Sequence, residues 1–371
     1  MRVLIACGGS GGHIFPAIAL AQGLIEKNNK TDTMFVGSNA VLDKRIFKKE
    51  HFKYSLLSAN KLAYKLSFKW IIFFTKLIFD ILKSFFILVR YRPDVVVGFG
   101  GYVSGPVILT AYVLGIPRIV HEQNVVPGRA NAFLFRFTEK IAISFEETRK
   151  YLKNYAYKAV FTGNPIRAAL LKDDRSGNMK KLGLDTDKFT ILVIGGSQGA
   201  HNLNKTFLKA LTKFNADMRS VIQVIHITGI MDYAWASEAY KELGLEHRVF
   251  SFIDRIEEAY SASDLVVTRS GASAIFEIAY FGRPMILVPY PFAMSHQSEN
   301  ARFFSEKCAA IQVDEKELSP DLIKDKVELL LKDKRRLGEM AESAKRLSVP
   351  ASSYNLAKEV FSLCKRQQDD S

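Results

Sequence analysis

A histidine directly follows a glycine-rich turn near the start of the chain, in the segment Gly8-Gly-Ser-Gly-Gly-His13. The apolar residues before this turn predict a buried strand, and the residues after it predict a helix. Backbone amides at such a turn and the dipole of the helix both favour an anion such as a phosphate. Histidine is the side chain best suited to accept a proton near neutral pH. The pattern indicates either a base beside a phosphate site or a histidine that caps or supports the helix.

The same order of strand, glycine turn and helix returns in the second half of the chain, at Thr190–Ile194 and Gly195-Gly-Ser-Gln-Gly-Ala200. The two copies predict an α/β fold with two Rossmann-like domains that face each other across a cleft. Binding of NAD is disfavoured, because Ile14 replaces the third glycine of the fingerprint and the Val36-Gly-Ser38 strand end lacks an acid. The arrangement suits an enzyme that joins two phosphorylated substrates.

Two further polar segments follow predicted strands in the first half. The apolar strand Asp94–Gly98 runs into Gly98-Phe-Gly-Gly-Tyr-Val-Ser-Gly-Pro106, and the strand Ile116–His121 delivers His121-Glu-Gln-Asn124. Ligands of open parallel sheets bind at the carboxyl ends of the strands. The first glycine turn and these two segments are therefore predicted to lie at one edge of one sheet.

The segment Gly163-Asn-Pro-Ile-Arg167 marks the expected domain boundary, and its arginine is placed to neutralise a phosphate. We expect a first Rossmann-like domain over residues 1–163 and a second over residues 164–345. Residues 346–371 are expected to form a C-terminal helix that is able to pack back on the first domain.

The second half offers a carboxylate suited to a ribose. Ser270 is predicted to cap a helix that starts near Ala272, and the free amides of that helix would face a diphosphate. Glu277 lies about a turn and a half into the helix, where a carboxylate accepts both hydroxyls of a ribose, although a glutamate in mid-helix is more often solvated. The segment Pro291–Asn300 adds donors and acceptors for sugar hydroxyls.

The composition excludes several other classes of protein. Cys7, Cys308 and Cys364 lie far apart without metal-ligand or CxxC spacing, and they are interpreted as reduced thiols of a cytoplasmic protein. The N-terminus shows no signal peptide, and the chain has no Walker sequence, nucleophile elbow or metal-ligand cluster. The function that these exclusions leave is metal-independent group transfer from a nucleotide-activated donor.

The net charge of +14 draws attention to the segment Lys61–Arg92, where seven basic residues stand against the single acid Asp80. Basic residues recur every seven positions, which predicts a basic stripe on one helical face, with Asp80 on the same side. The stripe consists of Lys69, Lys76, Lys83 and Arg90, and its apolar neighbours include Trp70, Phe73, Phe74 and Leu77. Such a helix either packs on a core with a solvated face or rests on anionic lipid. We favour lipid, and the apolar aromatics argue against nucleic acid.

Six segments occur in the order and spacing of the MurG family of peptidoglycan N-acetylglucosaminyltransferases, which the chain resembles from Met1 to about Asn355. They are Gly8–His13, Gly98–Pro106, His121–Asn124, Gly163–Arg167, Gly195–Ala200 and Arg269–Ala272. The resemblance implies the GT-B glycosyltransferase fold. It also implies transfer of GlcNAc from UDP-GlcNAc, with inversion, to the MurNAc C4 hydroxyl of undecaprenyl-diphospho-MurNAc-pentapeptide (lipid I to lipid II).

The family implies a peripheral enzyme at the cytoplasmic face of the plasma membrane that uses no cofactor and no essential metal. It also implies cell-wall or division machinery as further partners. Carried over by position, His13 would be the general base, with Glu122 as the alternative. Donor contacts would come from Ser10, Gly11, Gly12, Asn124, Arg167, Ser197, Ile253, Ala272, Ser273, Ala274, Ile275, Phe276, Glu277, His296 and Gln297. Acceptor contacts would come from His13, Tyr102, Ser104, His121 and Glu122, and the basic helix would form the membrane patch.

Two departures from the family pattern affect the donor side. Ser273-Ala-Ile-Phe276 replaces the more usual Leu-Thr-Val-Ser type of run, and His296 stands where some members have glutamine. Two alternative enzymes remain open: another transferase of UDP-sugars to lipid acceptors, and a UDP-GlcNAc 2-epimerase, which needs no membrane patch. A non-catalytic subunit that binds UDP-sugars would require the histidine and the acceptor segments to be dispensable.

Overall fold

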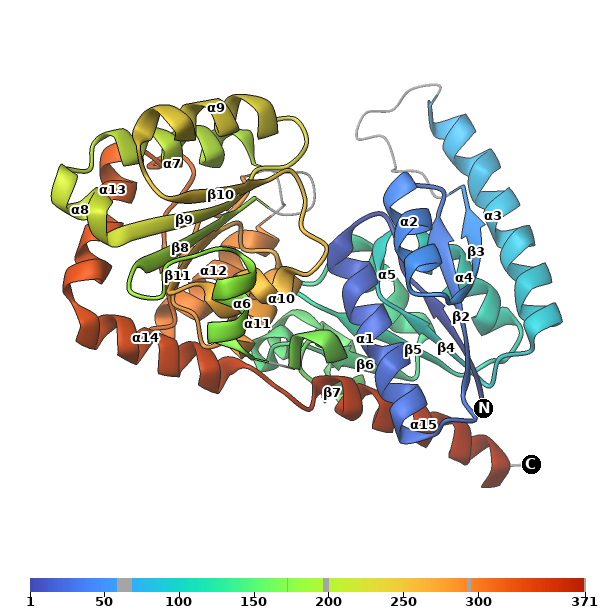
Figure 1. The fold of residues 1–371 in the computed structure, drawn as a ribbon. Coiled ribbons are helices and arrows are strands. Elements are labelled where there is room, and N and C mark those ends of the chain that lie inside the picture. The colour runs from blue at the N-terminus through green and yellow to red at the C-terminus, as the bar shows by residue number, and fades with distance from the viewer. Residues whose placement is uncertain (59–68, 172, 196–199, 292–294, 370–371) are drawn as a thin grey trace. The chain divides into compact units, whose positions relative to one another are not determined.

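The computed structural model describes the chain apart from residues 59–68, 172, 196–199, 292–294 and 370–371, and it describes only the backbone of residues 69–74 and 365–369. The chain forms two compact units (Figure 1). Met1–Ala168 and Pro350–Ser371 make up the first unit, and Ala169–Val349 make up the second.

The first unit is built on a seven-stranded sheet in the order β3-β2-β1-β4-β5-β6-β7, and all its pairings are parallel. Its strands are β1 (Arg2–Ala6), β2 (Asp32–Ser38), β3 (Lys53–Leu57), β4 (Val95–Gly98), β5 (Arg118–Glu122), β6 (Lys140–Ile143) and β7 (Ala159–Phe161). Its α-helices are α1 (Gly11–Lys27), α2 (Val41–Lys49), α3 (Lys69–Tyr91), α4 (Gly101–Val113), α5 (Arg129–Leu134) and α15 (Ser352–Asp369). Ala6 pairs with Gly98 and Gly98 with Val120, so the carboxyl ends of β1, β4 and β5 share one edge, as predicted.

Alternate residues of β1 serve two hydrophobic layers, because successive side chains of a strand point to opposite faces. Val3 and Ile5 pack in the layer that contains α1 and α15, whereas Leu4 and Ala6 pack in the layer that contains α4. A methyl group added at Gly23 of α1 would lie 3.0 Å from the Ser353 carbonyl oxygen, so this glycine allows the two helices to approach closely. The C-terminal helix is therefore part of the core of the first unit.

The second unit has a six-stranded parallel sheet in the order β10-β9-β8-β11-β12-β13. Its strands are β8 (Phe189–Ile194), β9 (Ile222–Ile227), β10 (His247–Phe250), β11 (Leu265–Thr268), β12 (Met285–Leu287) and β13 (Ala310–Gln312). Its α-helices are α6 (Arg175–Lys181), α7 (His201–Thr212), α8 (Ala216–Val221), α9 (Tyr233–Leu243), α10 (Ile256–Ala262), α11 (Ala272–Tyr280), α12 (His296–Glu306), α13 (Pro320–Lys332) and α14 (Lys334–Leu347). The two predicted strand–turn–helix copies start at the central strands β1 and β8.

The sequence patterns do not predict three of the strands. Lys53–Leu57 is half-buried and polar in part, while Lys140–Ile143 and Ala310–Gln312 are too short to show a period. The predicted helical tail is also interrupted, because α14 ends at Leu347 and α15 begins at Ser352. No helix in the described part of the chain is long and apolar enough to cross a membrane.

Candidate functional site

The first glycine turn is held by a buried carboxylate from α2. Gly9 N–H donates to Asp43 Oδ2 at 3.1 Å and to Oδ1 at 3.2 Å, and Asp43 is fully buried. A methyl group added at Gly8 would lie 2.4 Å from Asp43 Oδ2, so only glycine fits there. The sequence predicts free amides at this turn, but this prediction is wrong for Gly9, because an internal carboxylate accepts its N–H.

His13 lies in the first turn of α1 and is half-buried. Its Nδ1 lies 3.2 Å from the Gly8 carbonyl oxygen and 3.4 Å from Ser10 Oγ. A carbonyl only accepts hydrogen bonds, so this contact assigns the proton to Nδ1 and leaves the lone pair on Nε2. Burial lowers the pKa of His13, while the Gly8 carbonyl and the charges of Glu122 and Asp43 act in the opposite direction. The ring is therefore neutral near pH 7, with Nε2 as the basic atom.

Glu122 ends β5 and is buried, with both carboxylate oxygens engaged. Oε1 accepts from Asn124 N at 2.9 Å and from Asn124 Nδ2 at 3.1 Å. Oε2 accepts from Gly128 N at 3.0 Å and from Asn131 Nδ2 at 2.8 Å. This geometry orders the loop from Glu122 to Asn131 and with it the half-buried Asn124.

The other residues predicted on the acceptor side differ in exposure. His121 is buried, with Nε2 bonded to Gly163 O at 3.1 Å and Nδ1 to Gln123 Nε2 at 3.2 Å, and burial lowers its pKa to about 4. Ser104 is buried and donates to two carbonyl oxygens at the sheet edge. Tyr102, in the first turn of α4, is 44% exposed. Contact with an acceptor remains a prediction for these three residues.

Arg167 lies near the end of the continuous part of the first unit. Its guanidinium carbon lies 4.2 Å from the centre of the Phe15 ring of α1, which is a cation–π distance. Ser10 is the N-cap residue of α1, Gly11 is its first residue, and Gly12 is exposed. These residues belong to the first unit together with Asn124.

In the second unit, Ser270 does not cap α11 as the sequence predicts. Gly271 is the N-cap residue, and Ser270 Oγ donates to the Gln297 carbonyl oxygen at 2.8 Å. Asn300 Nδ2 returns a hydrogen bond to Ser270 O at 3.2 Å. The serine therefore joins the start of α11 to the start of α12, because a partner distant in sequence competes with the local cap.

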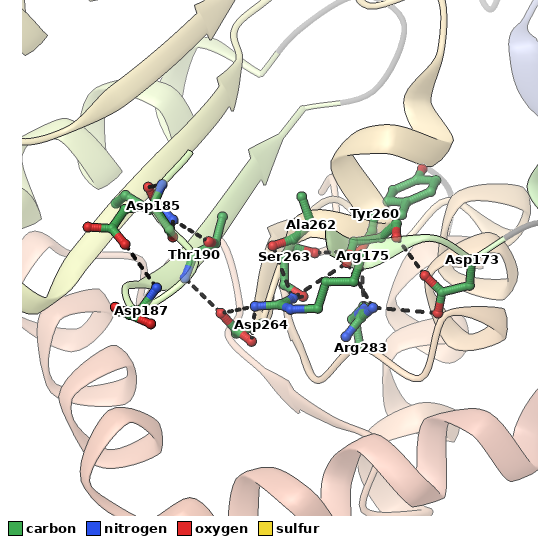
Figure 2. A network of polar contacts seen from close by, with 12 residues as sticks. Asp173, Arg175, Asp185, Asp187, Thr190, Tyr260, Ala262, Ser263, Asp264 and Arg283 are labelled. Carbon is green, nitrogen blue, oxygen red and sulfur yellow. Dashed lines mark hydrogen bonds and ion pairs between the residues drawn. The ribbon is translucent and has the colours of Figure 1, made fainter. Parts of the chain in front are cut away.

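Glu277 of α11 is buried rather than solvated. The Tyr260 hydroxyl of α10 donates to Glu277 Oε2 at 3.4 Å. Two arginines hold the C-terminal end of α10 (Figure 2). Arg283 Nε and Nη2 donate to the carbonyl oxygens of Tyr260 and Ser261 at 3.1 and 2.8 Å.

Arg175 completes this network from α6 (Figure 2). Its Nη1 donates to the carbonyl oxygens of Ala262 and Ser263 at 3.1 and 3.0 Å, and its Nη2 bonds both oxygens of Asp264. Cations at a helix C-terminus stabilise the last carbonyl groups. The network therefore fixes the helix that carries Tyr260.

The remaining donor-side residues lie at the starts of α11 and α12, in the connection between β10 and α10, or outside the described residues. Ala272, Ser273, Ile275 and Phe276 are buried in the first two turns of α11, and Ala274 is half-buried. His296 and Gln297 open α12, and Gln297 Oε1 accepts from Tyr290 N at 2.9 Å. Ile253 is half-buried between β10 and α10. Ser197 lies outside the described residues.

Asp43, Asn131 and Tyr260 are positioned at these sites, but the sequence patterns do not single them out. Asp43 lies in the first turn of α2, the helix that follows β2. A search for polar residues after each predicted strand end would therefore have found it. Among the described residues, no group of three His, Cys, Asp or Glu side chains is placed to hold a metal ion.

Helix α3 exposes an apolar face. Its exposed large side chains are Ile78, Phe79, Leu82, Phe85, Phe86 and Val89. Lys76, Lys83 and Arg90 are also exposed, whereas Leu77 is half-buried. Asp80 is buried and accepts from Ser58 N at 2.8 Å, so it turns away from solvent. The side chains of Lys69, Trp70, Phe73 and Phe74 lie outside the described part.

Two α/β units, each with a parallel sheet and polar residues at its carboxyl edge, are typical of the GT-B fold, and family models show that the chain is a glycosyltransferase of this class. Residues 3–143 match the glycosyltransferase family 28 N-terminal domain, and residues 190–357 match the glycosyltransferase family 28 C-terminal domain. The chain is 37% identical to a protein of Halothermothrix orenii over 94% of this chain and 95% of the relative. That relative is named UDP-N-acetylglucosamine–N-acetylmuramyl-(pentapeptide) pyrophosphoryl-undecaprenol N-acetylglucosamine transferase.

The chain belongs to this family, the MurG family of N-acetylglucosaminyltransferases. The crystal structure of MurG from Acinetobacter baumannii is similar, with a TM-score of 0.73 and 26% identity over 98% of this chain and all of that one. A UDP-GlcNAc 2-epimerase from Neisseria meningitidis, 14% identical with a TM-score of 0.69 over 98% of this chain and 100% of that one, shares the fold alone. The predicted family and fold are thus confirmed.

Proposed function

We propose that this enzyme transfers GlcNAc from UDP-GlcNAc, with inversion, to the MurNAc C4 hydroxyl of undecaprenyl-diphospho-MurNAc-pentapeptide in peptidoglycan biosynthesis. Membership of the family supports the donor and the acceptor. The observation that carries the chemistry is the fixed His13 imidazole, whose Nδ1 is bonded to Gly8 O at 3.2 Å. Its Nε2 is the atom left to accept a proton from the muramyl hydroxyl.

In this reaction the muramyl oxygen attacks the anomeric carbon of GlcNAc while the bond to the UDP oxygen breaks. The hydroxyl proton passes to Nε2 of His13, and UDP carries the negative charge away. We assign the base to His13 rather than to Glu122, because the Glu122 carboxylate already accepts four hydrogen bonds. Glu122 instead keeps Asn124 in place.

The donor is assigned to the second unit. Buried Glu277 would accept the two ribose hydroxyls, and the N-terminal amides of α11 would face the diphosphate. Amide dipoles and the Arg167 guanidinium would stabilise the charge on departing UDP, so the proposal includes no cofactor and no essential metal.

We further propose that the enzyme rests on the cytoplasmic face of the plasma membrane through α3. Phe79 and Phe86 are 68% and 69% exposed, and Lys83 is exposed near them on the same helix. Aromatic side chains that enter the lipid headgroups and cations that meet anionic lipid both favour such docking. Cell-wall or division machinery remains a proposed further partner.

The test is incubation of purified protein with radiolabelled UDP-GlcNAc and a lipid I analogue in detergent, followed by extraction of the lipid. We expect label in a lipid-linked disaccharide. If label appears instead on glycerolipids, the acceptor assignment fails. If UDP-ManNAc forms without any lipid product, the protein is an epimerase rather than a transferase.

A further inference from the structure

One peptide group in the first glycine turn lies between His13 and a buried carboxylate. The peptide that joins Gly8 to Gly9 carries the Gly8 carbonyl, which lies 3.2 Å from His13 Nδ1. The same peptide carries the Gly9 N–H, which donates to Asp43 at 3.1 and 3.2 Å. The three groups therefore form a continuous series of hydrogen bonds from carboxylate to imidazole.

Asp43 is well suited to act as a fixed negative charge. It is fully buried on α2, and Oδ2 also accepts from Ser38 N at 2.8 Å and from Ser38 Oγ at 2.7 Å. These donors, like Gly9 N–H, are neutral groups, which screen the charge of the carboxylate without cancelling it. The charge of Asp43 adds to the effect of burial in raising the pKa of the neighbouring Cys7 thiol. Its field therefore reaches the residues around the turn.

We propose that Asp43 is a positioning residue for catalysis, which acts on the His13 base through the Gly8–Gly9 peptide. This inference rests on the proposed role of His13. A carboxylate on the N–H side of a peptide polarises it and strengthens its carbonyl as an acceptor, since hydrogen bonds in series reinforce one another. The stronger carbonyl fixes the Nδ1–H tautomer and stabilises the imidazolium that forms when Nε2 accepts the muramyl proton.

No proton passes to the carboxylate in this scheme. The hydroxyl proton ends on Nε2, the proton on Nδ1 stays there, and Asp43 takes part in no proton transfer. The arrangement provides the orientation that a direct carboxylate–histidine hydrogen bond provides in hydrolase triads, with a peptide inserted between the two side chains. It also explains why an anion-type turn contains an internal carboxylate.

The groups that act on the imidazole come from several elements. Asp43 of α2 and Glu122 of β5 both raise the pKa of His13 against the effect of burial. From α4, Gly101 approaches the ring, since a methyl group added there would lie 3.3 Å from Nδ1, and Tyr102 is the titratable residue beside it. Removing the charge of Asp43 should therefore weaken the base and lower its pKa.

The test compares Asp43→Asn with Ser38→Ala in kinetics at saturating substrates across pH. The asparagine is nearly the same shape and can place its oxygen where Oδ2 accepts three hydrogen bonds, but it is uncharged. We expect kcat to fall about tenfold, less than the roughly 10²–10⁴ of a missing base. We also expect the acid limb of the profile to move to lower pH. Ser38→Ala removes one donor that screens the carboxylate, so its acid limb should move the opposite way.

A second readout does not depend on activity. In protein with labelled histidine, we assign the His13 resonances by their loss in His13→Ala and then titrate them. The wild type should be neutral in the Nδ1–H form, and Asp43→Asn should lower the pKa and increase the Nε2–H form. In the His13→Ala background, Asp43→Asn should lower the residual rate by a smaller factor than it lowers the rate of the wild type.

If the titration and the acid limb of Asp43→Asn match the wild type while kcat falls, Asp43 has only a structural role and the inference is overturned. If that variant does not fold, an unshifted or downshifted acid limb in Ser38→Ala overturns it equally. Full turnover in His13→Ala would instead show that His13 is not the base. The resonance titration would still report whether Asp43 acts on His13.

Discussion

The two units share one architecture but differ in the charged groups that order their predicted sites. In the first unit, the central strand β1 leads to a turn where Asp43 and Glu122 place two carboxylates near one histidine. In the second unit, Arg175 and Arg283 fix the end of α10 (Figure 2). Tyr260 of that helix donates a hydrogen bond to Glu277. Carboxylates around an imidazole favour proton uptake, whereas a buried, oriented glutamate favours binding of hydroxyls. This contrast is the reason for which we propose base chemistry in the first unit and nucleotide binding in the second.

The largest effect is expected at the base. His13→Ala should lower kcat by about 10²–10⁴ with UDP-GlcNAc affinity unchanged, because only proton transfer is lost. Steady-state kinetics and calorimetry measure the two quantities. His51→Asn is the matched control, since His51 is an exposed histidine of the same unit at a φ of 56° that asparagine tolerates. Equal loss in both variants would contradict the role of His13.

A smaller effect is expected at the ribose. Glu277→Gln should raise the Kd for UDP-GlcNAc by about 10–100-fold, because hydrogen bonds to a charged acceptor contribute about 1.5–3 kcal/mol. The amide still accepts from Tyr260, so the fold is kept. Glu306→Gln, an exposed glutamate on α12, is the control. An unchanged Kd in the Glu277 variant would show that this carboxylate does not bind the donor.

The exposed apolar surface of α3 gives a third comparison. The double variant Phe79→Ser/Phe86→Ser should lose about tenfold or more in affinity for phosphatidylglycerol vesicles, because each aromatic ring contributes up to about 1.5–3 kcal/mol on burial. Flotation with the vesicles measures the loss. Ile230→Ser/Met231→Ser removes two residues of the second unit that are 82% and 88% exposed, and should bind vesicles normally. If both double variants lose the same affinity for the vesicles, α3 is not the docking surface.

The smallest effect is expected at Tyr260. Tyr260→Phe removes the 3.4 Å hydrogen bond to Glu277 and should raise the Kd for UDP-GlcNAc about two- to tenfold. This effect is smaller than that of Glu277→Gln because the tyrosine orients the carboxylate and is not itself proposed to bind the donor. Tyr280→Phe is the control on α11, where the hydroxyl instead bonds the Leu171 carbonyl oxygen at 3.2 Å. An effect of the control as large as that of Tyr260→Phe would show that the loss is not specific to the hydrogen bond with Glu277.

The sequence predicts the parts of the fold whose signal is local. Apolar runs before the glycine turns locate β1 and β8, and the shared edge of β1, β4 and β5 follows from the rule that parallel strands end together. The edge strands β3 and β13 carry too little buried apolar surface to be recognised. Asp43 and Ser270 act through partners that are distant in sequence, Gly9 and Gln297, and no local pattern records such contacts. Local rules therefore find the turn but not the carboxylate that supports it.

The division of labour between the units is tested most directly by measuring kcat and the Kd for UDP-GlcNAc in His13→Ala and Glu277→Gln side by side. We expect His13→Ala to change kcat alone. We expect Glu277→Gln to raise Kd and to recover most of its kcat at saturating donor. If His13→Ala weakens donor binding as much as Glu277→Gln does, or if Glu277→Gln loses kcat with Kd unchanged, the assignment of base chemistry to the first unit and donor binding to the second is contradicted.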